Sequence, residues 1–466
     1  MILAPEIEEL IAALRAEIVS LRAEVAELKR RLGQDSSTSS KPPSSDGLTK
    51  KPRIAGSLRE ASGKPSGGQK GHTGGTLRQV ADPDRIVRHE ASHCRHCQGA
   101  LSAATIQGVE TRQVFDLAER PLVVTEHQAS VHRCDRCRGM TKAAFPAGVS
   151  APAQYGERIK AAAIYLNVQQ LIPEDRTAQA LSDLFGAPGL CAASLTAWVR
   201  QKARDLERVY AGVGARLAEA KVRHLDETGL RVAGSLHWLH TTSSDTLTFH
   251  RAEEKRGAVP EGLKGGVVVH DGFLPYGGLG PVDHALCNAH RLRELKALIE
   301  LDGEAWATPM RDMLLEANAA VRRARQAGLT ALAPGQGEAF VERYWSAVRE
   351  GLAFHRALPR LARDPQSRGR LKNRPGFNLL TRLKTFKDDV LRFLVDFDVP
   401  FTNNLAEQDI RMAKVKMKIS GAFRTLQGAK DFACLRSIVS TARKQGCDIL
   451  NVIAASPEQV ALALLA

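Results

Sequence analysis

Two pairs of cysteines carry the clearest chemical signal in the sequence. Cys94 and Cys97 form one Cys-x-x-Cys pair, and Cys134 and Cys137 form another. Each pair can make a tight turn that directs two thiolates to one point, and four thiolates give the tetrahedral set that Zn²⁺ prefers. The alternative, a redox dithiol, is typical of one such pair beside a βαβ unit. We therefore predict a structural Zn²⁺ site in a zinc-ribbon-like module over residues 85–150.

Two aspartates at the ends of predicted strands form the second signal. Residues 222–226 are typical of a strand that ends in Asp226, and the apolar run 266–270 is typical of a strand buried on both faces, which Asp271 follows. A carboxylate in this position must be hydrogen-bonded, solvated or bound to a cation. One such residue alone indicates a turn at a strand end, but two of them in a basic protein favour a metal site.

Glu407 supplies the third carboxylate that a phosphodiester site with two Mg²⁺ ions needs. It opens a predicted helix, and residues 411–430 contain six Lys and Arg and no acid. An acid at the start of a basic helix could bind a metal ion next to a phosphate backbone. It could equally interact with the helix dipole from the first turn. The basic residues that we expect to contact DNA are Arg411, Lys414, Lys416, Lys418 and Arg424.

These carboxylates need a scaffold that brings them together. After the first strand, the sequence predicts a hairpin around Gly234, a strand at 246–250, a short helix over 253–263 and the buried strand before Asp271. Antiparallel strands followed by a helix and a buried strand are the order of an RNase H-like α/β core. In that core the first and fourth strands lie side by side, so Asp226 and Asp271 would meet.

The N-terminal residues 1–33 carry an apolar heptad. Spacings that alternate between four and three residues keep one seam of a helix apolar. Mostly β-branched residues at the a positions and mainly Leu at the d positions favour a parallel two-stranded coiled coil. The alternative is an amphipathic helix packed on its own domain. The seam consists of Ile7, Ile11, Leu14, Ile18, Leu21, Val25, Leu28 and Leu32.

Three further segments complete the predicted organisation. Residues 34–84, rich in Ser, Pro, Gly and Lys, are interpreted as a flexible basic linker that is either a solvated tether or an arm that tracks nucleic acid. Residues 151–220 predict a helical, helix-turn-helix-like DNA-binding region, in which Gly186 ends one helix and Ser194 caps the next; a plain helical hairpin fits nearly as well. β-rich residues on both sides of Pro121 predict a hairpin inserted in the zinc module.

Charge and composition restrict the partners. The 466 residues include 66 Lys and Arg against 51 Asp and Glu, which gives a net charge of +15. This surplus indicates a polyanionic partner, because basic side chains release counterions from nucleic acid, although composition alone leaves an acidic membrane surface open. Eight cysteines are too few for a disulfide scaffold, and no stretch approaches the ~18 apolar residues of a membrane span. We expect a cytoplasmic protein.

Three segments together resemble bacterial DDE transposases of the insertion sequence 66 family. They are residues 270–276 (HDGFLPY), 284–295 (HALCNAHRLREL) and 401–411 (FTNNLAEQDIR). The heptad, the Ser-Lys-Pro-Pro-Ser-Ser linker and the paired Cys-x-x-Cys resemble that family too, so the likeness covers essentially the whole chain. The resemblance implies an RNase H-like DDE catalytic domain over residues 221–426.

Further elements and residue roles follow from the resemblance. It implies a helical insertion at about residues 295–395 and a short C-terminal helical element at 427–466. Asp226, Asp271 and Glu407 match the Asp, Asp and Glu that hold Mg²⁺ or Mn²⁺ in the family. The nearby acids expected to act as hydrogen-bonding partners are Glu227, Asp283 and Glu294.

Cys287 and His290 resemble a Cys-x-x-His found after the second Asp in several DDE families. Two ligands do not complete a Zn²⁺ site, so we expect an accessory role that is structural or faces DNA. The resemblance also implies small accessory proteins of the same element as partners.

We therefore expect a bacterial, nucleoid-associated transposase. It would bind terminal inverted repeats and target DNA as a homodimer or higher oligomer, and would cut and join DNA strands with Mg²⁺ or Mn²⁺. The rival hypothesis is a DNA-binding regulator in which the zipper, the zinc module and the helix-turn-helix carry the whole function. A third is a nuclease of the same fold that joins no strands. Metal-dependent cleavage of a repeat end, and joined products, distinguish the three.

The zinc hypothesis predicts that Cys97→Ser or Cys134→Ser releases one Zn²⁺ per chain. Residues 90–140 should loosen while the carboxylate-bearing core stays folded, because the module is separate in sequence. Elemental analysis measures the zinc, and proteolysis measures the loosening. Purified wild-type protein without stoichiometric Zn²⁺ would refute the hypothesis.

Overall fold

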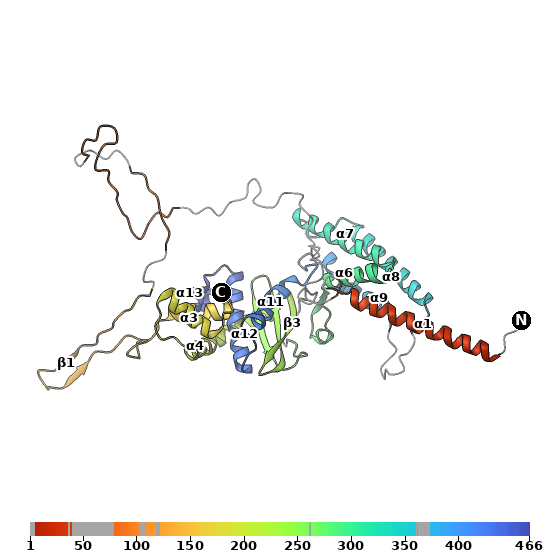
Figure 1. Ribbon diagram of the computed structural model, residues 1–466, viewed down its shortest axis with the longest axis horizontal. Helices are drawn as coiled ribbons and strands as arrows, with labels where there is room; N and C mark the ends of the chain where they lie inside the picture. The colour runs from red at the N-terminus through yellow and green to blue at the C-terminus, as the bar shows by residue number, and fades with distance from the viewer. Residues whose placement is uncertain are drawn as a thin grey trace. The chain divides into compact units, whose positions relative to one another are not determined.

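The computed structural model of the chain describes residues 5–35, 38–39, 79–101, 109–116, 122–260, 262–359, 361 and 373–466 (Figure 1). Most of the predicted linker, and Leu117 and Pro121 of the predicted hairpin, lie outside the described residues. The chain divides into one unit made of residues 1–52 and 128–466 and a second made of residues 53–127. We describe each unit by itself.

A five-stranded mixed sheet lies at the centre of the larger unit. The strand order is β5-β4-β3-β6-β7. β3 pairs antiparallel with β4 and β4 with β5, whereas β6 runs parallel to both β3 and β7. The first and fourth strands of this sheet are therefore neighbours, as predicted. The strands are β3 (Val222–Val232), β4 (Ser235–Ser243), β5 (Thr248–Glu253), β6 (Val267–His270) and β7 (Asp283–Leu286).

The sheet differs from the predicted one in three places. β3 is one continuous strand of 11 residues where two shorter strands are expected. β7 is an additional strand of four residues, too short to show a pattern of its own. The helix predicted over residues 253–263 is wrong for the part that the structure describes. Pro260 and Gly262, whose φ is 72°, do not suit a helix there.

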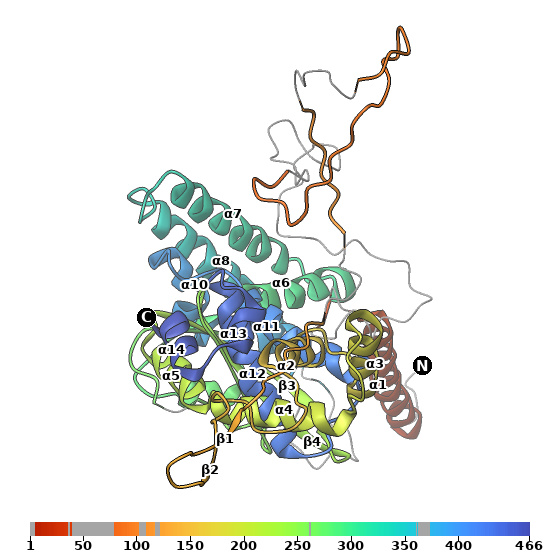
Figure 2. The same ribbon diagram turned by 90° about the vertical axis from the view of Figure 1, so that its left-hand side faces the viewer.

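Helices that precede the sheet in the sequence and helices that follow it share one hydrophobic core with the sheet. They are α2 (Glu157–Ile164), η2 (Tyr165–Gln169), α4 (Ala192–Asp205), α5 (Glu207–Glu219), α11 (Asn404–Ile419), α12 (Leu426–Lys444), α13 (Ile449–Ala454) and α14 (Pro457–Leu465). α3 (Glu174–Phe185) packs instead in a smaller cluster around Leu181 and Leu195. α11 packs on β3 and β4, and α12 packs on β5, α4 and α5 (Figures 1 and 2). The same buried cluster contains Leu206 between α4 and α5, Leu239 of β4 and Ile438 of α12.

A second group of helices separates β7 from α11 and has its own core. These are α6 (Asn288–Ala297), η4 (Leu298–Asp302), α7 (Ala307–Gln326), α8 (Gln336–Ala357), α9 (Pro375–Thr385) and α10 (Lys387–Val395). Trp306 and Tyr344 are fully buried in this core. Buried Glu304 accepts a hydrogen bond from Trp306 Nε1 at 2.7 Å and lies 3.0 Å from His355 Nε2. None of the described helices combines the length and apolar character that a membrane crossing requires.

The ends of α3 and α4 confirm one prediction and correct another. α3 ends at Gly186, whose φ of 69° is the left-handed conformation that suits glycine at a helix end. α4 begins after Cys191, where the backbone is still extended, so Ser194 lies inside the first turn and is not the cap. A DNA-binding role for this helix pair stays a prediction.

The two cysteine pairs form turns of the same kind. In each, the backbone N–H of the first cysteine donates to the carbonyl of a glycine at 2.9 Å. Positive φ at Gln98 (58°) and Arg138 (60°) closes the turns. β1 (Val131–Arg133) and β2 (Met140–Lys142) flank the second turn. Residues 122–130, expected in a hairpin between the pairs, carry no strand.

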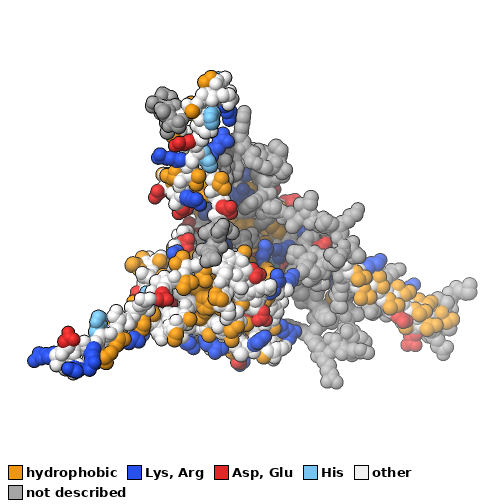
Figure 3. Space-filling view, turned by 60° about the vertical axis from the view of Figure 1, so that its left-hand side comes forward, with side chains coloured by type: hydrophobic (Ala, Val, Ile, Leu, Met, Phe, Trp, Pro, Cys, Tyr) orange, Lys and Arg blue, Asp and Glu red, His pale blue; other side chains and the backbone are white. Residues whose placement is uncertain are grey.

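The heptad forms one long helix, α1 (Pro5–Gly33), with an exposed apolar seam. Ile7, Ile18 and Val25 are 46–47% exposed. Figure 3 shows hydrophobic side chains gathered along this helix. Apolar surface left in water costs free energy, so the seam suits burial against another helix. A coiled coil with a second copy stays a prediction.

Charge placed on this seam tests the coiled coil. Leu14→Glu combined with Leu21→Glu would bury unpaired carboxylates in a zipper, so the N-terminal association should break. Sedimentation measures the oligomeric state. Glu9→Gln with Glu17→Gln, on exposed positions of the same helix, is the control and should leave that state unchanged. An unchanged state after deletion of residues 1–33 would show that α1 is a surface helix.

Candidate functional site

The sheet register brings the two predicted aspartates together. β3 and β6 pair with Val222 opposite Val267 and His224 opposite Val269. The same register, continued by two residues, sets Asp226 of β3 opposite Asp271, which follows β6. Side chains at equivalent positions of neighbouring strands point to the same face of a sheet. Both carboxylates therefore lie on one face at the point where the two strands diverge.

Electrostatics place the third acid beside them. Burial, followed by the negative charges of Glu227, Glu407 and Asp271, raises the pKa of Asp226 to about 7. The backbone N–H of Glu227 donates to Asp226 Oδ1 at 2.9 Å and opposes this shift only in part. The negative charges around Asp226 would be balanced by a bound cation. Oxygen donors grouped in this way are those that hard divalent cations such as Mg²⁺ bind.

Glu227 differs from the other three acids because its own partners hold it. Arg256 Nη2 donates to its Oε1 at 2.8 Å, and the Tyr276 hydroxyl donates to its Oε2 at 2.6 Å. The guanidinium of Arg256 also lies over the rings of Trp238 and Phe273, at 4.9 and 4.2 Å from their centroids. The Glu227 carboxylate is thus engaged, which leaves Asp226, the second aspartate and the glutamate of α11 as the open set.

The loop after β6 fixes Asp271. Its Oδ1 accepts the backbone N–H of Phe273 at 2.8 Å, and its carbonyl accepts Arg291 Nη2 at 3.2 Å. Gly272 between them has φ 99°, and a Cβ there would lie 2.8 Å from Arg291 Nη2. Only glycine suits both this backbone conformation and the close approach of the guanidinium.

Asn403 positions Glu407 relative to β3. It is 1% exposed and precedes α11, yet its side chain does not cap that helix. Its Nδ2 donates to the Leu225 carbonyl at 2.7 Å, and its Oδ1 lies 2.9 Å from His224 Nδ1. Its backbone N–H donates to Cys287 Sγ at 3.2 Å. One residue therefore ties the start of α11 to the strand position beside Asp226.

Asp409 holds the next turn of α11 on the sheet. Its Oδ2 accepts Ser243 Oγ at 2.6 Å, Thr248 Oγ1 at 3.0 Å and Lys444 Nζ at 2.8 Å. These partners come from β4, β5 and α12. The hydrogen bonds and the positive charge of Lys444 lower the pKa of Asp409 against the effect of its burial.

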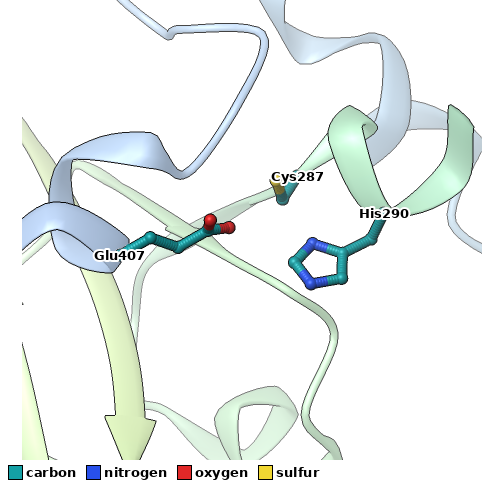
Figure 4. A group of neighbouring side chains, drawn as sticks. All are labelled: Cys287, His290 and Glu407. Carbon is teal, nitrogen blue, oxygen red and sulfur yellow. The ribbon is translucent and has the colours of Figure 1, made fainter. Parts of the chain in front are cut away.

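Cys287 and His290 lie beside Glu407 (Figure 4). Ligand atoms of the three side chains all lie within 4.8 Å of one another. Burial raises the pKa of the Cys287 thiol to about 11. Within the described part of the chain, neither His290 Nδ1 nor Glu407 Oε1, both buried, has a hydrogen-bond partner. The Cys-x-x-His spacing in the sequence indicates that Cys287 and His290 lie close together. Nothing in the sequence shows that Glu407 lies beside them.

The other predicted acids lie in ion pairs, as expected for hydrogen-bonding partners. Asp283 lies 3.4 Å from Arg392 Nη2. Glu294 accepts Arg291 Nη1 at 2.8 Å and is also paired with Arg382.

The basic residues predicted on and after α11 fall into two groups. Lys416 is half-buried, with its Nζ 4.2 Å from the centroid of Phe423, and burial lowers its pKa. Lys416 therefore packs against the protein, in contrast to the other predicted DNA contacts. The pattern of residues along the helix does not reveal this. The exposed members of the predicted set are Arg411, Lys414, Lys418 and Arg424.

The cysteine turns favour thiolates. Backbone N–H groups of Cys97 and His96 lower the pKa of Cys94, and those of Cys137 and Arg136 lower the pKa of Cys134. Hydrogen bonds to sulfur stabilise the charged form that binds metal. Each turn by itself is suited to donate two thiolates, and their union in one Zn²⁺ site stays a prediction.

The raised pKa of Asp226 predicts a pH-dependent stability. Its folded pKa of about 7 lies above the ordinary value of 3.8, so ionisation costs stability as pH rises from about 4 to 7. Asp226→Asn should therefore stabilise the metal-free protein at pH 8, by about 4 kcal/mol at most, and the gain should shrink toward pH 4. Urea unfolding in EDTA measures it. Asp183→Asn, at an exposed position of α3, should give no comparable gain. A gain that is constant with pH would contradict the account.

Comparisons with known proteins support the resemblance seen in the sequence. A family model described as Transposase IS66 family matches residues 152–431, more than half of the chain and all of the carboxylate-bearing core. A second model, Family of unknown function (DUF6444), matches residues 2–78. No curated protein and no solved structure matches the chain. The chain belongs to the transposase IS66 family.

Proposed function

We propose that this protein is a DDE transposase that binds the terminal inverted repeats of an insertion sequence and catalyses metal-dependent cleavage and transfer of DNA strands. The observation that carries the proposal is the grouping of Asp226, Asp271 and Glu407, which come from β3, the end of β6 and α11. The strand order, with a parallel first and fourth strand, supports an RNase H-like core.

Asp226, Asp271 and Glu407 would hold Mg²⁺ or Mn²⁺. The buried Glu407 Oε1 that lacks a partner among the described residues, and the mutual repulsion of the carboxylates, fit a site that takes a cation. When bound, such ions activate water and then a 3′-hydroxyl for attack on phosphorus and stabilise the leaving oxygen. Asp226 must be ionised to bind, so protons compete with the cation and we expect the affinity for Mg²⁺ to rise as pH approaches about 7.

Exposed basic side chains would hold the DNA. Arg411, Lys414 and Lys418 lie on α11, the helix that carries Glu407. Contacts from Lys and Arg to phosphates provide affinity without reading sequence. Figure 3 also shows Lys and Arg gathered on the β1–β2 hairpin, which carries the second cysteine turn. We assign both surfaces to DNA contact.

The flanking elements would assemble the complex. The exposed seam of α1 would pair two chains, and the two Cys-x-x-Cys turns would share a structural Zn²⁺. Two copies would allow both ends of an element to be held together. The small accessory proteins implied for this family would join that assembly.

Two other functions make different predictions. A DNA-binding regulator would need no cluster of mutually repelling carboxylates, which cost stability. A nuclease of the same fold would cleave repeat ends and leave no joined products. The carboxylate cluster favours an enzyme, and joined products favour the transposase.

Removal of one carboxylate should separate binding from chemistry. We expect Asp226→Asn, Asp271→Asn and Glu407→Gln each to lower cleavage and joining with Mg²⁺ by on the order of 100-fold or more, because charge stabilisation in the transition state is lost. Repeat DNA should still be shifted in gels, slightly more tightly, because a negative charge has been removed. Cleavage, joining and gel-shift assays on the same repeat fragment measure both effects.

Glu254→Gln is the matched control. This exposed acid just after β5 has the same charge and lies outside the carboxylate cluster, so its variant should cut and join like wild type. Normal cutting by Glu407→Gln would remove that residue from the site. Equal DNA binding by wild type and all three variants, with no cutting by any of the four proteins, would favour the regulator.

A further inference from the structure

A second group of metal ligands adjoins the carboxylate cluster and has a different chemical character. Cys287, His290 and Glu407 offer a sulfur, an imidazole nitrogen and a carboxylate oxygen within 4.8 Å of one another (Figure 4). We infer that these three side chains bind one divalent ion of the zinc class, in competition with the use of Glu407 by Mg²⁺. The competition rests on the proposed function, whereas the binding of the ion does not.

The backbone aims the three donors at one another. Cys287 follows β7 and is the residue before α6, and His290 lies in the first turn of that helix. The Cys-x-x-His spacing therefore places both side chains at one helix end. Glu407 comes from the first turn of α11, which the Asn403 hydrogen bonds hold against the same place.

Two of the three donor side chains have a buried atom that lacks a partner among the described residues. His290 Nδ1 and Glu407 Oε1 are buried and make no hydrogen bond. Buried polar atoms without partners are uncommon, and an ion that they share would satisfy both. Cys287 is fully buried, and its sulfur accepts the Asn403 N–H, a contact that also stabilises a thiolate. His290 and Glu407 are each partly exposed, so the group is in contact with solvent.

The donor set selects the ion. Thiolate and imidazole ligands favour Zn²⁺ and related ions, whereas Mg²⁺ favours oxygen. Three protein ligands with a fourth position for water are typical of accessible Zn²⁺ sites. On binding, the Cys287 thiol loses its proton to solvent and the thiolate coordinates the metal, with no change of oxidation state. The ion would withdraw Glu407 from Asp226 and Asp271, so zinc would inhibit the Mg²⁺ reaction.

Cobalt spectroscopy on the full-length protein tests the binding. Co²⁺ coordinated by a thiolate has a charge-transfer absorption, so a titration counts thiolate-bound ions. We expect Cys287→Ser to bind one Co²⁺ fewer than wild type, and His290→Asn to bind that ion roughly tenfold or more weakly. Cys434→Ser, which removes another buried thiol, in α12, should match wild type. Equal stoichiometry and affinity in all four proteins would overturn the inference.

Two further measurements keep the test decisive. If circular dichroism shows that Cys287→Ser does not fold, the affinity of His290→Asn decides, because its weakened binding is expected independently. In Mg²⁺-dependent cleavage, Zn²⁺ should inhibit wild type and Cys434→Ser at the same concentration, and Cys287→Ser only at roughly tenfold higher concentration. Equal inhibition of all three would overturn the competition. If no protein cuts DNA, the proposed function fails, while the Co²⁺ titration still decides the site.

Discussion

The hydrogen bonds of Asn403 are the contact on which the arrangement of the site depends. Its side-chain amide binds the backbone of Leu225 and the ring of His224, the two residues before Asp226 in β3. Its backbone N–H reaches Cys287 after β7, and its carbonyl accepts the N–H of Glu407 at 3.3 Å. A single buried residue thus joins two strands and a helix that lie far apart in sequence.

The cluster that results is costly to fold. Asp226 is buried among other carboxylates, and its raised pKa is the measure of that cost. Around it, nearby acids are paired: Glu227 with Arg256 and Tyr276, and Asp409 with Lys444. These partners balance Glu227 and Asp409, whereas the charge around Asp226 is one that a cation would relieve. Such a concentration of unfavourable electrostatic interactions at one place is typical of catalytic sites.

Local patterns were sufficient to predict the parts of the site but not the contacts that assemble them. Asp226 and Asp271 could be found because each follows a short apolar run, and strand order then made them neighbours. The strand end expected at Asp226 was wrong, because β3 continues through this residue to Val232. The helix expected over residues 253–263 was wrong in the part that the structure describes, because Pro260 and the positive φ of Gly262 do not suit a helix. Asn403 carried no usable signal, since an Asn before a helix predicts a cap, and only the fold shows that its amide turns to a strand instead. The proximity of Glu407 to Cys287 and His290 could not be predicted either, because it too depends on contacts between distant parts of the chain.

The central claim is that three carboxylates from β3, the loop after β6, and α11 together bind the catalytic cation. A crystal structure of the full chain with repeat-end DNA and Mn²⁺, with data collected for manganese anomalous scattering, tests it most directly. The account predicts an anomalous peak coordinated by Asp226, Asp271 and Glu407 next to the phosphate to be cut. A peak bound elsewhere, with these three carboxylates uncoordinated, would contradict it.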